Sequence, residues 1–216
     1  MTDELELLKQ DWQKKEFDVP KLSYEAIHKM IWKKSSSIVK WILIISILEF
    51  TLPHLLFLLP GTSEAMNVYE SIGISRFFYG ISIFYYVIVL FFIYQFYLRF
   101  KEISVLDNSK NLMRNILKTR KMVKYYVIFS LATAVLSVLM IVMGIYLSDD
   151  IINAFPNMGD KLKDVSPEKL KMSLMIAMGI FGSLFVAVLA LFYFLFYGLL
   201  LRKLKKNYRE LRNLEL

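Results

Sequence analysis

Residues 35–60 read SSSIVKWILIISILEFTLPHLLFLLP. From position 38 to position 59 the run is almost purely apolar, and an α-helix needs roughly 20 such residues to cross the hydrocarbon core of a bilayer. A carboxylate, Glu49, lies near the centre of the run, and Pro53 follows four residues later. The stretch therefore predicts a membrane-spanning helix that carries an unusual polar position.

The rest of the chain contains further long apolar segments. Hydrophobic side chains make up 56% of the 216 residues, whereas soluble domains have about 45–50% apolar residues. Three more segments, 77–98, 123–147 and 172–201, are long and apolar enough to cross a bilayer. The sequence thus predicts an all-α membrane protein, an antiparallel four-helix transmembrane bundle with cytoplasmic helical extensions.

The distribution of basic residues predicts the orientation of these spans. Of the 27 Lys and Arg residues, 22 lie in residues 1–40, 99–124 and 202–216. Because cytoplasmic segments of membrane proteins are enriched in Lys and Arg, we expect both termini and the central loop on the cytoplasmic side. The net charge of +8 then reflects topology, and we expect no direct contact with nucleic acid.

A division into domains follows from this orientation. We expect a cytoplasmic N-terminal helical arm over residues 1–37, followed by a four-span membrane domain over residues 38–201. A cytoplasmic helical hairpin over residues 99–121 interrupts the membrane domain, and residues 202–216 form a cytoplasmic tail. We interpret the chain as a multi-pass protein of the bacterial inner (cytoplasmic) membrane.

Several helix ends have sequence signals. Asp107, Asn108 or Ser109 can cap a helix or form a turn after the second span. Ser166 followed by Pro167 is a typical helix start, and the fourth span could continue into the charged C-terminal tail. Tyrosines near the expected inner interface are interpreted as interfacial anchors, among them Tyr94, Tyr97, Tyr125, Tyr126, Tyr193 and Tyr197.

Composition argues against most kinds of active site. The chain has no Cys and only two histidines, His28 and His54, which a helix would hold far apart on either side of the first apolar run. We therefore expect no metal site and no cofactor. The sequence contains no nucleophile–base pair and no phosphate-binding loop, so we do not expect an enzyme.

Glu49 and Pro53 together predict a special position in the first span. A carboxylate avoids lipid and turns to the interior of a bundle, and Pro53 lacks the N–H that would bond to the carbonyl of Glu49. We predict a kinked but continuous helix that places the free carbonyl and the side-chain carboxylate of Glu49 in the same place. Two interpretations remain open: a proton or cation step at Glu49 and His54, or a structural hydrogen bond to a neighbouring span, for example to Tyr85 or Tyr86.

Small residues in the fourth span form a candidate packing face. Gly179, Ser183 and Ala187 recur at four-residue spacing, with Gly182 beside them. Small residues at this spacing let two helices approach closely in a membrane. We expect this face to pack against another span of the same chain, with a homo-oligomer as the alternative.

The N-terminal arm is the segment that a bilayer explains least. Leu5, Leu8 and Trp12 share one stripe of a first helix, and Ser23 can cap a second helix in which Tyr24, Ile27 and Ile31 share a face. Short amphipathic helices need another surface to cover their apolar faces. Three surfaces are open: a cytoplasmic protein partner, the protein's own hairpin, or the lipid surface.

The segments DELELLKQDWQKKE, PKLSYEAIHKMIWKKSSS and WILIISILEF resemble a group of uncharacterised four-span inner-membrane proteins of Gram-negative bacteria. Some of these are encoded beside extracytoplasmic-function sigma factors. The resemblance covers roughly the first fifty residues and implies a membrane-anchored, anti-sigma-like regulator whose arm binds a cytoplasmic partner. Two alternatives stand beside this function: a structural or assembly subunit of an envelope complex, and a small transporter or channel subunit that uses Glu49.

Overall fold

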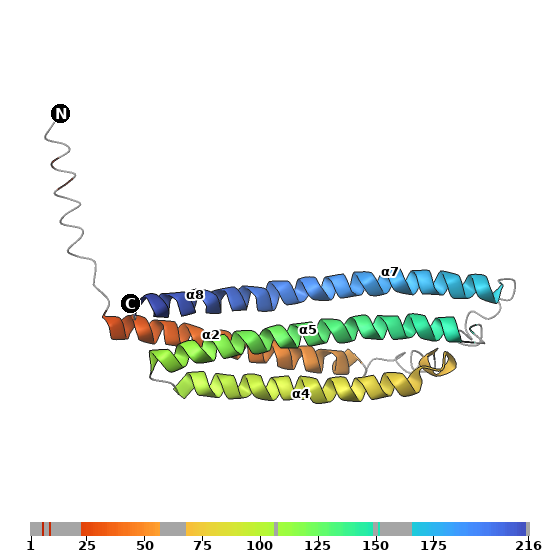
Figure 1. Cartoon of the computed structure of the whole chain (residues 1–216), viewed down its shortest axis with the longest axis horizontal. Coiled ribbons are helices and arrows are strands. Elements are labelled where there is room, and N and C mark those ends of the chain that lie inside the picture. The colour runs from red at the N-terminus through yellow and green to blue at the C-terminus, as the bar shows by residue number, and fades with distance from the viewer. Residues whose placement is uncertain are drawn as a thin grey trace.

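The regular structure of this chain is helical. The computed structural model describes residues 23–56, 68–105, 108–148 and 166–214, together with Glu6, Lys9 and Ile151, and none of these lies in a β-strand. The principal elements are, in chain order, α2 (Tyr24–Leu56), α4 (Ser75–Val105), α5 (Ser109–Leu147), α7 (Pro167–Tyr193), a π-helical segment η2 (Phe194–Gly198) and α8 (Leu199–Leu214). Figure 1 shows the long helices lying side by side along the long axis of the molecule.

Four helical stretches are long and apolar enough to cross a membrane. They are Tyr24–Leu55, Ser75–Ile103, Ser109–Leu147 and Pro167–Leu214, the last of which combines α7, η2 and α8. The predicted spans 77–98, 123–147 and 172–201 lie inside these helices, and the predicted span 38–59 is described as far as Leu56. The chain is therefore a multi-pass helical membrane protein, as its sequence predicts.

The helix-start signals are confirmed. The side chain of Asn108 caps α5 by accepting a hydrogen bond from the backbone N–H of Lys110. Ser166 caps α7 in the same way by accepting from Lys169, with proline in the first turn of the helix. Ser23 Oγ accepts from the backbone N–H of Ala26 at the start of α2. Each cap satisfies a backbone donor that the helix itself leaves free.

The first long helix differs from the sequence prediction at its N-terminal end. The expected short helix after Ser23 and the expected first span form one element, α2, of 33 residues. No break falls near residue 37, because the segment between Ile31 and Ile38 contains only residues that a helix tolerates and no Gly or Pro. The helix also continues through Pro53 to Leu56, which confirms a continuous rather than broken helix at the proline.

Two apolar clusters hold the helices together. A large one, the main core, unites residues of α2, α4, α5, the end of α7, η2 and α8, including Ile42, Phe96, Val123, Tyr197 and Leu204. A small one, the end cluster, joins Ile72, Ile74, Ile145, Ile151 and Leu170. In Figure 1 the end of α8 lies beside the start of α2, at the same end of the molecule as the end of α4 and the start of α5.

Polar contacts fix that end of the bundle. The indole N–H of Trp32 donates to the carbonyl of Ile103 at 2.6 Å. The side-chain amide of Asn207 in α8 donates to Ser35 Oγ at 3.0 Å, in a buried pair. Both bonds satisfy polar groups that would otherwise lie unpaired among apolar side chains. They tie the start of α2 to α4 and α8.

Candidate functional site

Glu49 lies on the inward face of α2. Val39, Ile42 and Ser46 precede it at helical spacing and are all buried, so Glu49 continues a stripe that faces the bundle. Ser46 Oγ donates to the carbonyl of Leu43 in its own helix at 2.8 Å. Ser46 therefore does not bind the carboxylate, whose partners come from other helices.

Two tyrosines from distant parts of the chain hold the carboxylate. The hydroxyl of Tyr126 in α5 donates to Glu49 Oε2 at 2.6 Å, and the hydroxyl of Tyr197 in η2 donates to the same oxygen at 3.2 Å. A bond of 2.6 Å has the length of a strong, charge-assisted O–H···O contact. The interhelical hydrogen bond expected of Glu49 thus exists, and its donors are these two residues rather than Tyr85 or Tyr86.

This finding corrects the interpretation of three tyrosines as interfacial anchors. Tyr126 and Tyr197 are each 1% exposed and Tyr193 is 5% exposed. The Tyr126 ring packs edge-on against Tyr193 and Tyr197 and against Phe92 and Phe96 of α4. Their rings belong to the main core, and a buried phenol needs a hydrogen-bond partner, which Glu49 provides for Tyr126 and Tyr197.

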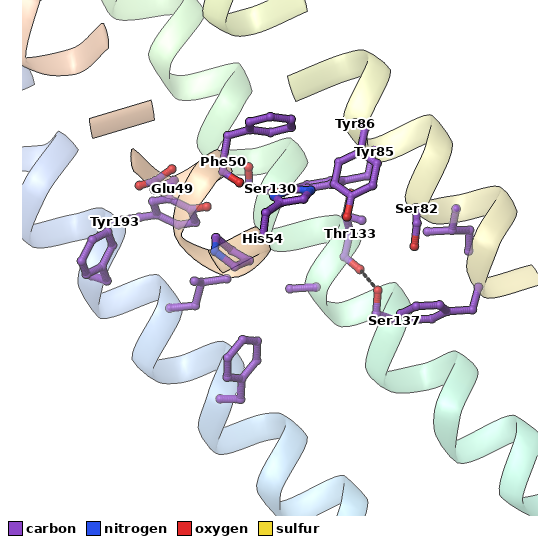
Figure 2. Close-up of a pocket in the computed structure, with 17 residues that line it drawn as sticks. Glu49, Phe50, His54, Ser82, Tyr85, Tyr86, Ser130, Thr133, Ser137 and Tyr193 are labelled. Carbon is purple, nitrogen blue, oxygen red and sulfur yellow. Dashed lines mark hydrogen bonds between the residues drawn. The ribbon is translucent and has the colours of Figure 1, made fainter. Parts of the chain in front are cut away.

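A cavity adjoins Glu49 at the border of the main core, whose residue Tyr193 forms part of its wall. It has a volume of about 320 Å³, and all four long helical stretches contribute to its walls. The labelled side chains in Figure 2 come from α2, α4, α5 and α7: Glu49, Phe50 and His54; Ser82, Tyr85 and Tyr86; Ser130, Thr133 and Ser137; and Tyr193. Along α5 these positions fall between Val123 of the main core and Ile145 of the end cluster. The cavity therefore occupies the gap between the two apolar clusters.

Polar groups in the cavity wall differ in how they are satisfied. His54 Nδ1 lies 2.6 Å from the carbonyl of Phe50; since a carbonyl only accepts, this nitrogen carries the proton. Thr133 and Ser137 donate to carbonyls of their own helix. Among the described residues, Glu49 Oε1 and Ser130 Oγ are buried without a hydrogen-bond partner. Of the two, Glu49 Oε1 faces no competing hydroxyl donor and is available to a ligand.

The charge of the cavity wall is one-sided. Its lining includes one carboxylate, from Glu49, and no lysine or arginine among the described residues. His54 and three tyrosines are the other titratable lining groups. The wall can therefore accept a proton or a positive charge at Glu49, and it offers no fixed cation to an anionic guest.

The sequence predicted part of this site. Glu49, Pro53 and His54 all line the cavity. Ser130, Tyr126 and Tyr197 were missed as functional residues. One signal was available: Ser130, Thr133 and Ser137 recur on one face of the apolar segment 123–147, and polar side chains in a span usually face the protein interior.

The partner-binding positions predicted on α2 pack within the chain. Ile31 is 3% exposed and belongs to the main core, and Ile27 packs against it. Tyr24 remains half-exposed, with its hydroxyl 3.1 Å from Ser109 Oγ. This face of α2 thus docks on the protein's own helices. Leu5, Leu8 and Trp12 lie outside the described residues.

The predicted small-residue face does not contact another helix. Ser183 and Ala187 are exposed, and a Cβ added at Gly179 would meet no atom within 4 Å. Gly182 is the residue of close approach, since a Cβ there would collide with the Val138 side chain of α5. The within-chain packing predicted for Gly179, Ser183 and Ala187 is therefore wrong. The close contact between α7 and α5 lies at Gly182 instead.

Comparisons with known proteins give a family but no activity. No curated protein matches the chain, and no solved structure does. A family model described as a domain of unknown function, DUF8845, matches residues 25–216 and so covers every described element from α2 to α8. Since the match extends over most of the sequence, the chain belongs to the DUF8845 family.

Proposed function

We propose that this protein is a small transporter or channel subunit in which Glu49 carries a proton or binds a cation. One observation carries the proposal: a carboxylate within a membrane-spanning helix lines a cavity of about 320 Å³ and keeps one oxygen without a partner. Ionisable side chains in spans are costly and commonly mark pathways for ions or protons. His54 lines the same cavity and is a second carrier of protons.

A purely structural role explains the hydrogen bonds at one oxygen of the Glu49 carboxylate but not the second, unpaired oxygen. The bonds from Tyr126 and Tyr197 join α2 to α5 and η2 through Oε2. A carboxylate kept only for packing would have both oxygens satisfied, because an unpaired polar atom away from water is destabilising. The unpaired Oε1 and the adjoining cavity therefore favour a site that exchanges a ligand.

The proposed setting is the inner membrane of a bacterium. We propose an antiparallel four-helix bundle with both termini in the cytoplasm, supported by the 22 of 27 basic residues that lie in residues 1–40, 99–124 and 202–216. With this orientation, the end of the bundle that holds Trp32 and Asn207 is cytoplasmic. The cavity then lies nearer the outer face, between the main core and the end cluster.

Flux measurements on purified protein test the proposal. We expect proteoliposomes that contain the wild-type chain to carry a proton or cation flux under an imposed pH gradient, and Glu49→Gln to reduce it to the rate of protein-free vesicles. Gln keeps the size of Glu but cannot release a proton. Glu25→Gln is the matched control, since Glu25 is an exposed carboxylate on the same helix.

Two results would contradict the proposal. One is an undiminished flux in Glu49→Gln, which would separate the flux from this carboxylate. The other is a wild-type rate equal to that of empty vesicles, which would return the protein to a structural or assembly role.

A further inference from the structure

We propose that the cavity beside Glu49 binds a hydrophobic organic cation, with its positive charge at the Glu49 carboxylate and its apolar body against the aromatic wall. This inference rests on the proposed function and names the class of solute. It draws on three properties of the cavity: its charge, its aromatic lining and its size.

The charge of the wall selects the sign of the ligand. Among the residues that the structure describes, Glu49 is the one carboxylate in the cavity wall, and no Lys or Arg lies there. Charge interactions strengthen where water is excluded, so a cation is attracted and an anion repelled. Tyr126 and Tyr197 both donate to Oε2. These bonds fix the carboxylate in place and leave Oε1 for the ligand.

The aromatic lining selects an organic rather than an inorganic cation. Seven of the 17 lining residues are Phe or Tyr. Rings of Phe50, His54 and Tyr86 form one continuous group, with centroids 4.9 to 5.9 Å apart. Aromatic faces attract positively charged groups and are the usual walls of sites for quaternary ammonium ligands.

A metal ion fits this wall poorly. Hard cations such as Ca²⁺ and Mg²⁺ take about six or more oxygen ligands. Glu49 supplies the one carboxylate, and no group of three His, Asp or Glu residues able to hold a metal occurs in the described part of the chain. An organic cation needs no such shell, because its substituents contact the rings directly.

The size of the cavity agrees with a small molecule. Its volume of about 320 Å³ lies at the lower end of the range of about 300–1,000 Å³ for small-molecule pockets. A proton would not require this volume.

Equilibrium binding with a matched pair of probes tests the inference. The full-length protein in lipid nanodiscs is titrated with tetraphenylphosphonium, a cation, and with tetraphenylborate, an anion of the same shape. We expect saturable binding of the cation only. Glu49→Gln should weaken it at least about tenfold, since removing one member of a desolvated charge pair has a large effect on affinity. Glu25→Gln should bind as the wild type does.

A second variant guards against misfolding of Glu49→Gln. Tyr86→Leu retains the carboxylate but removes one ring of the wall, and we expect it to weaken tetraphenylphosphonium binding several-fold. The inference is overturned if the wild type binds the two probes alike, or if Glu49→Gln and Tyr86→Leu, eluting as folded protein in gel filtration, bind the cation as tightly as the wild type.

The binding and flux results separate the two proposals. Glu49-dependent proton flux without cation binding overturns this inference and leaves the proposed function standing. Glu49-dependent binding of tetraphenylphosphonium without any flux supports the inference and overturns the proposed transport.

Discussion

Glu49 differs from the other residues of α2 in how its main-chain carbonyl and its two side-chain oxygens are hydrogen-bonded. Pro53 has no N–H, so the helix does not pair the main-chain carbonyl of Glu49. Tyr126 and Tyr197 donate to one oxygen of its side chain, and the other oxygen has no partner among the described residues. The carboxylate is thus held on one side and available on the other.

The two tyrosine bonds differ in length, and their removal should differ in effect. We expect Tyr126→Phe, which deletes the 2.6 Å bond, to lower the free energy of unfolding by about 1–3 kcal/mol, because it leaves a buried acceptor poorly satisfied. Tyr197→Phe deletes the 3.2 Å bond and should have a smaller effect. Denaturant titration in detergent micelles measures both.

Tyr125→Phe is the matched control for these variants, since Tyr125 is 51% exposed and its ring lies beside Lys121. We expect it to unfold as the wild type does. Equal stability of Tyr126→Phe and Tyr125→Phe would contradict the assignment of the bond from Tyr126 as a fixed support of Glu49.

The sequence predicts that the Glu49 side chain faces the protein interior, but it does not predict which residues donate hydrogen bonds to it. A carboxylate in a span must turn inward, and that part is predictable from Glu49 alone. Which tyrosine reaches it depends on the rotation of each helix about its axis. The π-helical turn over Phe194–Gly198 changes that rotation locally, and no residue in FLFYG signals it.

At the scale of elements, helix ends are well encoded and helix faces are not. The caps at Asn108 and Ser166 were predicted because side-chain oxygens at helix starts have a clear sequence pattern. The face of α7 that packs against α5 was not predicted correctly. This helix is apolar all round, so its hydrophobic pattern cannot distinguish the side facing the protein from the side facing lipid.

The contact between α5 and α7 offers a sharp test at Gly182. We expect Gly182→Ala to lower the free energy of unfolding by about 1–3 kcal/mol, since the added methyl group would collide with Val138. Gly179→Ala, one turn earlier and with open space around it, should leave stability unchanged or raise it slightly, because Ala favours helices.

Thermal unfolding of the two variants in the same detergent gives the comparison. If Gly179→Ala is the more destabilising of the two, then the helix is rotated from the orientation described, and the small-residue face predicted from the sequence is the packing face after all.

At the scale of the whole molecule, the helices are longer than a bilayer requires. The stretch Pro167–Leu214 has 48 residues, which corresponds to about 72 Å of helix, against about 30 Å for the hydrocarbon core. The main core unites this extra length with the start of α2. The cavity lies at the border of the main core, toward the end cluster, where α2 ends at Leu56 and the remaining helices continue.

If Glu49 exchanges a proton or a cation, then the cavity beside it must be reachable from the aqueous phase. The chain contains no Cys, so single cysteines can be introduced at Ser82 and Ser137, which line the cavity, and at Ser183, an exposed position of α7 outside it. A water-soluble thiol reagent reacts only with an ionised thiol that water can reach.

The one measurement we would make is the rate of this reaction in the membrane. We expect rapid labelling of Ser82→Cys and Ser137→Cys, and no labelling of Ser183→Cys, whose thiol would face lipid. Unreactive thiols at both cavity positions would show that the site is dry and would contradict the role proposed for Glu49.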